Sequence, residues 1–123
     1  MGYLVGKEKN ILIIEDDKII SVVLQTYLKK LGFNVIDSVT TGEDAIEIAK
    51  KTKPDIILSD IMLDGILNGI EAVKEITRHI KTDIIYMTSH TDPKYKKMAA
   101  ETNYIDFLHK PVTFDTLQKT LTY

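Results

Sequence analysis

The sequence predicts an α/β domain in which a parallel sheet carries helices on both of its faces. Short apolar runs alternate five times with longer segments of helical period, and the connections between them are short. The runs at 11–14 and 56–58 are apolar without alternation, which is typical of strands buried on both faces. Short crossovers of this kind are right-handed, so the pattern predicts one compact doubly wound unit.

Composition indicates a single globular domain and excludes several classes of function. The chain has 123 residues, of which 44% are hydrophobic and 28% charged, and its net charge of -2 does not indicate direct nucleic-acid binding. No apolar run approaches the roughly 20 residues that span a bilayer, and residues 1–7 lack a signal-peptide core. The absence of Cys excludes thiol catalysis and disulfides. We expect one cytoplasmic domain over 1–123, with its core at about 9–121, no output domain and no membrane association.

The first half of the chain predicts three strands and two helices. The first strand, at 11–14, precedes a helix that ends at Gly32. The next strand is expected at 33–36. A second helix opens at Thr41 and ends before Pro54, where a third strand begins and runs to Asp60. The apolar positions of the two helices recur at helical spacing: Ile20, Val23, Leu24, Tyr27, Leu28 and Leu31 in the first, and Ala45, Ile46, Ile48 and Ala49 in the second.

The second half repeats the alternation after a loop at 61–69. A third helix follows the loop, and then a strand at 83–88 ends in the hydroxyl of Thr88. A weakly apolar fourth helix is expected at about 93–102, with Asn103 in the left-handed conformation after it. A fifth strand is expected at 104–108, before a last helix. The apolar positions of the third and last helices are Ile70, Val73, Ile76 and Ile80, and Phe114, Leu117 and Leu121.

Acidic side chains, one hydroxyl and one lysine lie at the carboxyl ends of the predicted strands. Glu15 and Asp16 follow the first strand, Asp60 and Thr88 end the third and fourth, and Lys110 follows the fifth. The carboxyl ends of parallel strands share one edge of the sheet, so these groups should converge there. Carboxylate oxygens suit Mg²⁺ or Mn²⁺, and an ammonium and a hydroxyl suit phosphoryl oxygens. The set predicts a phosphoryl-transfer site in which a carboxylate such as Asp60 forms an aspartyl-phosphate.

Other phosphate sites do not fit this sequence. No glycine-rich loop follows the first strand, so a nucleotide or dinucleotide cradle is not expected. The acids at that turn would repel the phosphate of a flavin, which argues against a flavin site at the same position.

Five blocks of sequence resemble the receiver domain of two-component response regulators, in the order and spacing of that family, from about 9 to 121. They are ILIIEDD (11–17), PDIILSDIML (54–63), NGIE (68–71), IIYMTS (84–89) and DFLHKP (106–111). The resemblance implies a flavodoxin-like (βα)5 three-layer sandwich with a five-stranded parallel sheet of order 2-1-3-4-5.

The resemblance also implies roles for the acidic residues. Asp60 would accept a phosphoryl group from a phosphohistidine on a sensor histidine kinase or a phosphotransfer protein. The Mg²⁺ cofactor would bind Asp60, Asp16 directly, Glu15 through water, and Met62 through its backbone carbonyl.

The resemblance implies a switch as well. Lys110 would pair with the phosphoryl oxygens, and its peptide bond to Pro111 would be cis. Thr88 would move toward the phosphate, and Phe107 occupies the position of the switch aromatic. An unknown output domain or target would bind the face formed by the fourth helix, fifth strand and fifth helix, and a homodimer formed on phosphorylation is left open.

The sequence departs from the family pattern at several positions. Glu15 replaces the commoner Asp. Asp64 stands where Pro is usual, in a loop that is one residue longer. Phe107 lacks the hydroxyl of the usual Tyr. Met62 and His90 occupy the positions that flank the path of attacking water in the family.

The sequence is also compatible with alternative interpretations. Asp16 or Asp17 could simply cap the first helix, and the three histidines lack metal-ligand spacing and are expected at the surface. One rival function is a phosphatase that passes through an aspartyl-phosphate, but Met62 stands where such enzymes place a general acid. The other is a degenerate receiver that only binds a partner. We expect a phosphoacceptor switch and not a turnover enzyme.

Overall fold

The computed structural model describes residues 9–63 and 65–122, and these residues form five parallel strands and five helices around one sheet. The strand order is β2-β1-β3-β4-β5, as expected. The strands are β1 (Asn10–Ile14), β2 (Asn34–Val39), β3 (Ile56–Asp60), β4 (Asp83–Thr88) and β5 (Asp106–His109). The helices are α1 (Lys18–Lys30), α2 (Gly42–Thr52), α3 (Gly69–Thr77), α4 (Pro93–Ala99) with the 3-10 turn η1 (Ala100–Thr102), and α5 (Phe114–Leu121).

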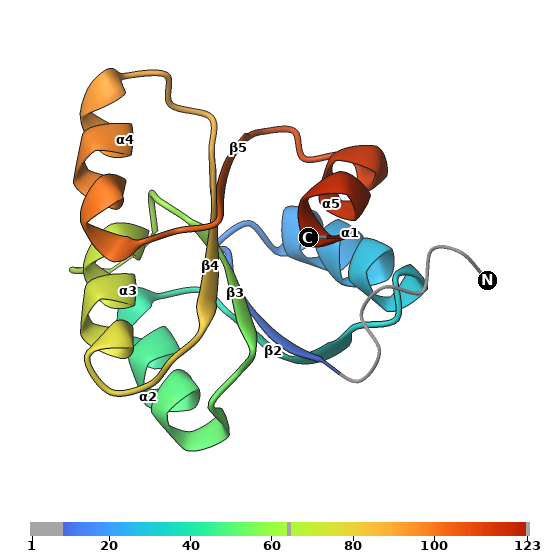
Figure 1. Cartoon of the computed structure of the whole chain (residues 1–123), viewed down its shortest axis with the longest axis horizontal. Coiled ribbons are helices and arrows are strands. Elements are labelled where there is room, and N and C mark those ends of the chain that lie inside the picture. Colours follow the sequence, from blue (N-terminus) through green and yellow to red (C-terminus); the bar gives the residue numbers. More distant parts are fainter. Residues whose placement is uncertain (1–8, 64, 123) are drawn as a thin grey trace.

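The helices form two layers on opposite faces of the sheet. Figure 1 shows α1 and α5 on one face and α2, α3 and α4 on the other. In the part of the chain that the structure describes, no helix combines the length and the apolar character needed to cross a membrane. The doubly wound arrangement leaves the carboxyl edge of the sheet uncovered, where the loops after each strand meet.

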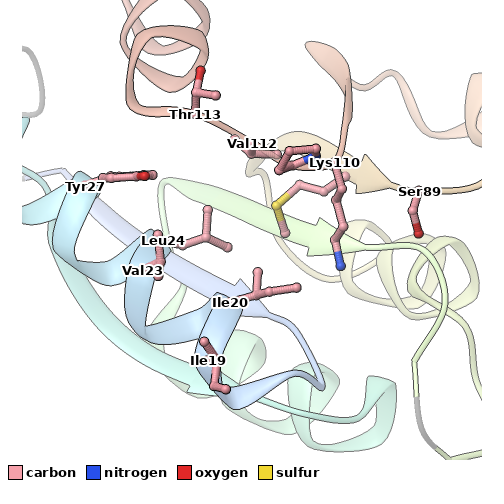
Figure 2. A pocket seen from close by; sticks show the side chains of 11 residues that line it. Ile19, Ile20, Val23, Leu24, Tyr27, Ser89, Lys110, Val112 and Thr113 are labelled. Atoms are coloured by element: carbon pink, nitrogen blue, oxygen red, sulfur yellow. The ribbon is translucent and has the colours of Figure 1, made fainter.

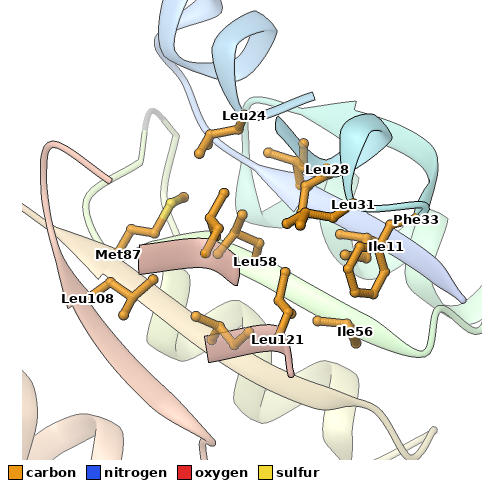
Figure 3. Close-up of a cluster of buried hydrophobic side chains, with 13 residues drawn as sticks. Ile11, Leu24, Leu28, Leu31, Phe33, Ile56, Leu58, Met87, Leu108 and Leu121 are labelled. Carbon is orange, nitrogen blue, oxygen red and sulfur yellow. The ribbon is translucent and has the colours of Figure 1, made fainter. Parts of the chain in front are cut away.

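Each face of the sheet has its own hydrophobic core. Along β1, Ile11 and Ile13 point into the core shared with α1 and α5, whereas Leu12 and Ile14 point into the core shared with α2 and α3. This is why the run at 11–14 does not alternate. Figure 3 shows the first of these cores, in which Leu24 and Leu28 of α1, Leu117 and Leu121 of α5, and Leu58 and Met87 of the sheet are all buried.

The helix starts follow from their capping residues. Asp17 accepts hydrogen bonds from the backbone N–H groups of the first turn of α1, and Thr41 accepts one at the start of α2. Asn68 and Glu71 form a reciprocal capping box at the start of α3. Asn103 has φ 51°, the left-handed conformation expected after the fourth helix.

Several element boundaries differ from those expected. β2 runs three residues beyond 36, because its pairing with β1 continues to the Ile14–Val39 pair. β5 begins at Asp106 and not at 104, since the left-handed turn at Asn103 carries the chain back to the sheet first. The fourth helix reaches 102, as expected, but its last turn is the 3-10 turn η1. Pairing with β1 decides the end of β2, and local sequence does not carry that information.

Candidate functional site

The ends of β1 and β3 bring three carboxylates together at the uncovered edge of the sheet. These strands are neighbours in parallel register, with Ile14 opposite Ser59. The residues that follow those positions, Glu15 and Asp60, therefore lie side by side, and Asp16 lies next to them. One carboxylate oxygen from each of the three lies within 4.8 Å of the others. Glu15 is only 1% exposed and Asp60 only 6%, so their charges are largely removed from water.

Lys110 supplies the cation of this cluster. Its backbone N–H donates to the Thr88 carbonyl at 2.9 Å, which continues the pairing of β5 with β4 beyond His109. The Lys110–Pro111 peptide bond is cis. The Lys110 Nζ donates a hydrogen bond to Asp60 Oδ2 at 2.7 Å and lies 2.7 Å from Glu15 Oε1 as an ion pair. One ammonium thus bridges two carboxylates that come from different strands.

The pKa of Lys110 reflects two opposed effects. Burial alone favours the neutral amine, but the contacts with Asp60 and Glu15 outweigh it, and the net result is a raised Lys110 pKa. The lysine therefore stays charged throughout the physiological range, and its ammonium is available to any anionic group that reaches Asp60.

The acidic cluster carries more negative charge than Lys110 can neutralise. When all three acids are ionised, one ammonium leaves two negative charges uncompensated within the cluster. Burial raises the pKa of Asp16, and the adjacent Glu15 carboxylate raises it further. The uncompensated negative charge and the raised Asp16 pKa both indicate that an added cation would be favourable at this site.

Both oxygens of the buried Glu15 carboxylate have partners. Glu15 Oε2 accepts from the Asp17 backbone N–H at 3.0 Å, and Glu15 Oε1 forms an ion pair with Lys110 Nζ at 2.7 Å. Two of the three carboxylates therefore share the single ammonium of Lys110. An oxygen-only donor set with excess negative charge fits Mg²⁺ or Mn²⁺.

The structure separates the roles of the two aspartates after Glu15. Asp17 is the cap of α1, and its Oδ1 accepts from the backbone N–H groups of Ile19 at 2.9 Å and Ile20 at 3.1 Å. Asp16 has no capping role and lies in the acidic cluster. Capping by Asp16, one of the alternatives left open by the sequence, is therefore wrong, and its carboxylate is available to a ligand.

Thr88 and Phe107 lie outside the contacts of the acidic cluster. Thr88 is fully buried at the end of β4, and its Oγ1 accepts from the His90 backbone N–H at 3.0 Å. In the described part of the chain, no side-chain hydrogen bond joins Thr88 to Asp60. Phe107 is half-buried on β5 opposite Tyr86, with ring centroids 6.1 Å apart, and it packs into the core beneath α4.

The loop after β3 places Met62 beside Asp60. The Met62 backbone N–H donates to Asp60 Oδ1 at 3.3 Å, while its side chain is 41% exposed. Further along, the Ile66 N–H donates to Glu43 Oε2 at 3.2 Å, which ties the loop to the start of α2. Asp64, the position that departs from the usual Pro, lies outside the described residues.

Gly69 is part of the site, although its role cannot be recognised from sequence alone. Its N–H donates to the Ile61 carbonyl at 2.7 Å. A Cβ at this position would lie 1.9 Å from the Asp60 carbonyl oxygen and 2.8 Å from Ser59 Oγ. Only glycine allows the start of α3 to approach β3 this closely. The sequence signal was limited to the Asn68-Gly69 pair, which marks a helix start but not the contact.

An apolar groove adjoins the cluster between α1 and the segment after β5. Figure 2 shows Ile20, Val23 and Leu24 of α1 along one wall, with Lys110 on the other side of the groove. Lys110 is also the residue whose ammonium contacts Asp60 and Glu15. The volume of the groove is about 530 Å³. Two aliphatic residues of α1 that line this groove are exposed, Ile19 at 78% and Val23 at 41%, so apolar surface lies beside a charged site.

The histidines do not contribute to the cluster. All three are exposed, as expected, and His79 pairs with Glu75 on its own helix at 2.9 Å. His90 and His109 lie on the side of α4 and β5, where they line a separate pocket with Phe107.

Comparison with known sequences identifies relatives across almost the whole chain. The family model for the response regulator receiver domain matches residues 11–122. A probable C4-dicarboxylate response regulator, DctR of Halalkalibacterium halodurans, is 34% identical over 114 residues, which cover 91% of this chain and 49% of that protein. Protein PilH of Pseudomonas aeruginosa is 32% identical over 114 residues, 90% of this chain and 93% of PilH. The chain thus spans about half the length of DctR.

Solved structures show the same fold. The signal receiver domain of a modulated diguanylate cyclase from Desulfovibrio desulfuricans superposes with a TM-score of 0.87 at 34% identity, covering 94% of this chain and 91% of that one. The receiver domain of a Pseudomonas aeruginosa sensor histidine kinase, solved with a magnesium ion in its active site cleft, gives 0.82 at 28% identity, covering 93% and 94%. The receiver domain of yeast Ssk1, solved with the histidine phosphotransfer protein Ypd1, gives 0.82 at 27% identity, covering 95% and 88%.

Proposed function

The chain belongs to the response regulator receiver domain family, and we propose that it acts as a phosphoacceptor switch in which Asp60 takes a phosphoryl group from a phosphohistidine. The observation that carries the proposal is the buried Asp60 carboxylate, held between two further carboxylates and the Lys110 ammonium at the end of β3. This arrangement supplies a nucleophile, a cation for phosphoryl oxygens and an oxygen-rich cation site in one place.

The proposed chemistry is a single group transfer. An Asp60 carboxylate oxygen attacks the phosphorus while the P–N bond of the phosphohistidine breaks, and the bonding electrons remain on the imidazole nitrogen. Lys110 Nζ, 2.7 Å from Asp60 Oδ2, is placed to pair with a phosphoryl oxygen as the charge develops. The Met62 N–H, which reaches Asp60 Oδ1, holds the carboxylate in position. The chain would thus be modified and not turn over a substrate.

The residues present fit a divalent cation. Glu15, Asp16, Asp60 and the Met62 carbonyl would hold Mg²⁺, which when bound would offset the charge of the phosphoryl oxygens. Two observations support this assignment: the excess negative charge of the cluster, and the magnesium ion in a related receiver domain.

The output would arise from a change in the partners of Lys110 and Thr88. A phosphoryl group on Asp60 adds negative charge and acceptor oxygens next to Lys110. The Thr88 hydroxyl, which now accepts from the His90 N–H, would donate to one of those oxygens. Phe107 would then rearrange on the α4–β5–α5 side, where an output domain, a target or a second copy of the chain would bind.

The phosphodonor would be a sensor histidine kinase or a phosphotransfer protein. The yeast relative solved with its histidine phosphotransfer protein supports this class of partner. On this chain, the apolar groove of α1 next to Lys110 offers a docking surface beside the acceptor (Figure 2). Ile19 and Val23, which are exposed and line this groove, would be covered in such a complex.

The test is the intact mass of the protein after incubation with acetyl phosphate and Mg²⁺. We expect one added phosphoryl group on the wild type, no addition without the metal, and none on Asp60→Asn. Asp115→Asn, which removes an exposed acid in the first turn of α5, is the matched control and should label like the wild type.

Three results would contradict the proposal. Equal labelling of Asp60→Asn would show that the acceptor lies elsewhere. An unlabelled wild type that also fails to bind beryllofluoride with Mg²⁺ would indicate a receiver domain that serves only as a binding module. Sustained hydrolysis of a phosphomonoester would instead indicate a phosphatase.

A further inference from the structure

Tyr86 is the largest fully buried side chain of the described residues, and the proposed chemistry gives it no role. It lies on β4, two residues before Thr88, with the end of α4 and the turn η1 packed over it. A buried tyrosine places a phenol hydroxyl in an apolar core, where it is costly unless it has a partner. The Tyr86 hydroxyl is therefore expected to have a hydrogen-bond partner inside the core.

The partner of the Tyr86 hydroxyl is Thr102, in η1. The two oxygens are 2.8 Å apart, and Thr102 Oγ1 in turn donates to the Ala99 carbonyl at 2.6 Å. Because the threonine hydroxyl has one proton and uses it on Ala99, Tyr86 must be the donor to Thr102. Burial raises the Tyr86 pKa to about 12, so this donor keeps its proton. The chain of bonds links the middle of β4 to the last turn of α4.

Few other polar side-chain contacts hold this end of α4 in place. Within the described residues, the other side-chain bond from η1 to another element is the exposed Lys74–Glu101 ion pair at 2.9 Å. Exposed pairs of this kind contribute little to stability. The buried Tyr86–Thr102 bond is therefore the stronger polar link between this end of α4 and the sheet.

The Tyr86 ring also forms the floor beneath Phe107. The ring centroids of Tyr86 and Phe107 are 6.1 Å apart, and Tyr104 contacts both rings at 5.8 Å. Lys96 of α4 lies over the Phe107 ring at 5.9 Å. Phe107 and Tyr104 also line a solvent-open pocket between α4 and β5, so the Phe107 ring lies at the surface of this face. Tyr86 thus contacts both the end of α4, through Thr102, and β5, through Phe107.

We propose that Tyr86 is a positioning residue that couples the Asp60 site to the α4–β5 surface, because its hydroxyl fixes the end of α4 on β4 while its ring supports Phe107. This inference rests on the proposed function. The Tyr86–Thr102 bond stabilises the arrangement described here, so a ligand at Asp60 that shifts α4 must break it. Removing the bond lowers the cost of that shift and strengthens the binding of such a ligand.

The experiment measures the affinity of the full chain for beryllofluoride in the presence of Mg²⁺. Tyr86→Phe and Thr102→Val each remove the bond and keep the shape of the side chain. Each should tighten binding about fivefold, the equilibrium factor that corresponds to one net hydrogen bond. The double variant should also tighten it about fivefold and not by the product, because the two groups act through one bond.

Two controls separate positioning from a general effect on stability. Thr102→Ser keeps the hydroxyl and should bind like the wild type. Tyr104→Phe removes a hydroxyl from the neighbouring ring, for which no hydrogen bond is found among the described residues, and it should also be unchanged. Amide hydrogen exchange of α4 and η1 in the unliganded protein should accelerate in Tyr86→Phe and Thr102→Val, while that of α1 stays constant.

Unchanged beryllofluoride affinity in Tyr86→Phe and Thr102→Val would overturn the inference, even with faster exchange in α4, since the bond would then be structural only. A Tyr86→Phe protein that fails to fold leaves Thr102→Val to decide. If the wild type does not bind beryllofluoride, both the proposed function and this inference are contradicted. If the wild type binds it and none of the variants changes the affinity, only the inference is contradicted.

Discussion

At the scale of single residues, Lys110 is the cation that partly neutralises the buried acidic cluster. Its ammonium lies 2.7 Å from oxygens of both Asp60 and Glu15, yet one positive charge cannot balance three carboxylates. The ionised form of Asp16 is therefore disfavoured, because burial and the nearby Glu15 carboxylate raise the pKa of Asp16. An acid whose pKa is raised in the folded state weakens the fold when the pH rises through that pKa.

Because ionised Asp16 is unfavourable in the folded protein, we predict that Asp16→Asn stabilises the metal-free protein. The same variant should weaken the binding of Mg²⁺. Near pH 7 in EDTA, the free energy of unfolding should rise by a few tenths of a kcal/mol to about 1 kcal/mol, because solvent screens this partly exposed group. Mg²⁺ binding should weaken by about tenfold or more, as expected for loss of a ligand. Urea unfolding and a Mg²⁺ titration measure the two effects.

Asp17→Asn is the matched control, since Asn caps a helix as well as Asp does. It should change neither the stability in EDTA nor the affinity for Mg²⁺ appreciably. Destabilisation of the metal-free protein by Asp16→Asn would contradict the description of the cluster as an excess of negative charge.

At the scale of elements, the β3–α3 junction sets the position of the acceptor. The start of α3 lies so close to β3 that a Cβ on Gly69 would fall 1.9 Å from the Asp60 carbonyl oxygen. The capping box of Asn68 and Glu71 fixes the same turn from the helix side. The Asp60 backbone is therefore held by the packing of α3 as well as by its own strand.

Gly69→Ala should destabilise the protein by about 1–3 kcal/mol or more, because the added methyl group meets backbone that cannot move aside freely. Thermal or urea unfolding measures the loss. Ser59→Ala removes the nearby hydroxyl but not the Asp60 carbonyl, so it should not rescue Gly69→Ala. Rescue would show that the clash is with the side chain and not with the backbone.

At the scale of the whole molecule, binding at the acidic cluster is linked to global stability. A cation that binds the folded chain and not the unfolded one raises the free energy of unfolding with its concentration. The cluster joins the ends of β1 and β3 with the residue after β5, which are far apart in the sequence and meet only in the folded chain.

Mg²⁺ should therefore raise the free energy of unfolding of the wild type by about 2.7 kcal/mol at a concentration one hundred times its Kd. NaCl at matched ionic strength is the control for screening, and EDTA should reverse the effect. Asp16→Asn should show a smaller gain at the same Mg²⁺ concentration. A gain that NaCl reproduces would indicate general screening and not a bound ion.

The alternation of strands and helices follows from local sequence patterns, and it places the functional groups at one edge of the sheet. The acids after β1 and β3, the hydroxyl at the end of β4 and the lysine after β5 are all local features, and parallel pairing is enough to bring them to one edge. The helix starts at Asp17 and Thr41 and the left-handed Asn103 follow from side-chain chemistry within a few residues. Local information was sufficient for each.

Other features depend on contacts between segments that are distant in the sequence, and these features could not be predicted from it. The extension of β2 to Val39 follows from pairing with β1, and the bridging position of Lys110 follows from its pairing with β4. The need for glycine at Gly69 and the hydrogen bond from Tyr86 to Thr102 arise where packed elements approach within atomic contact. Such contacts depend on how helices and strands dock in three dimensions, and periodicity along the chain does not encode that docking.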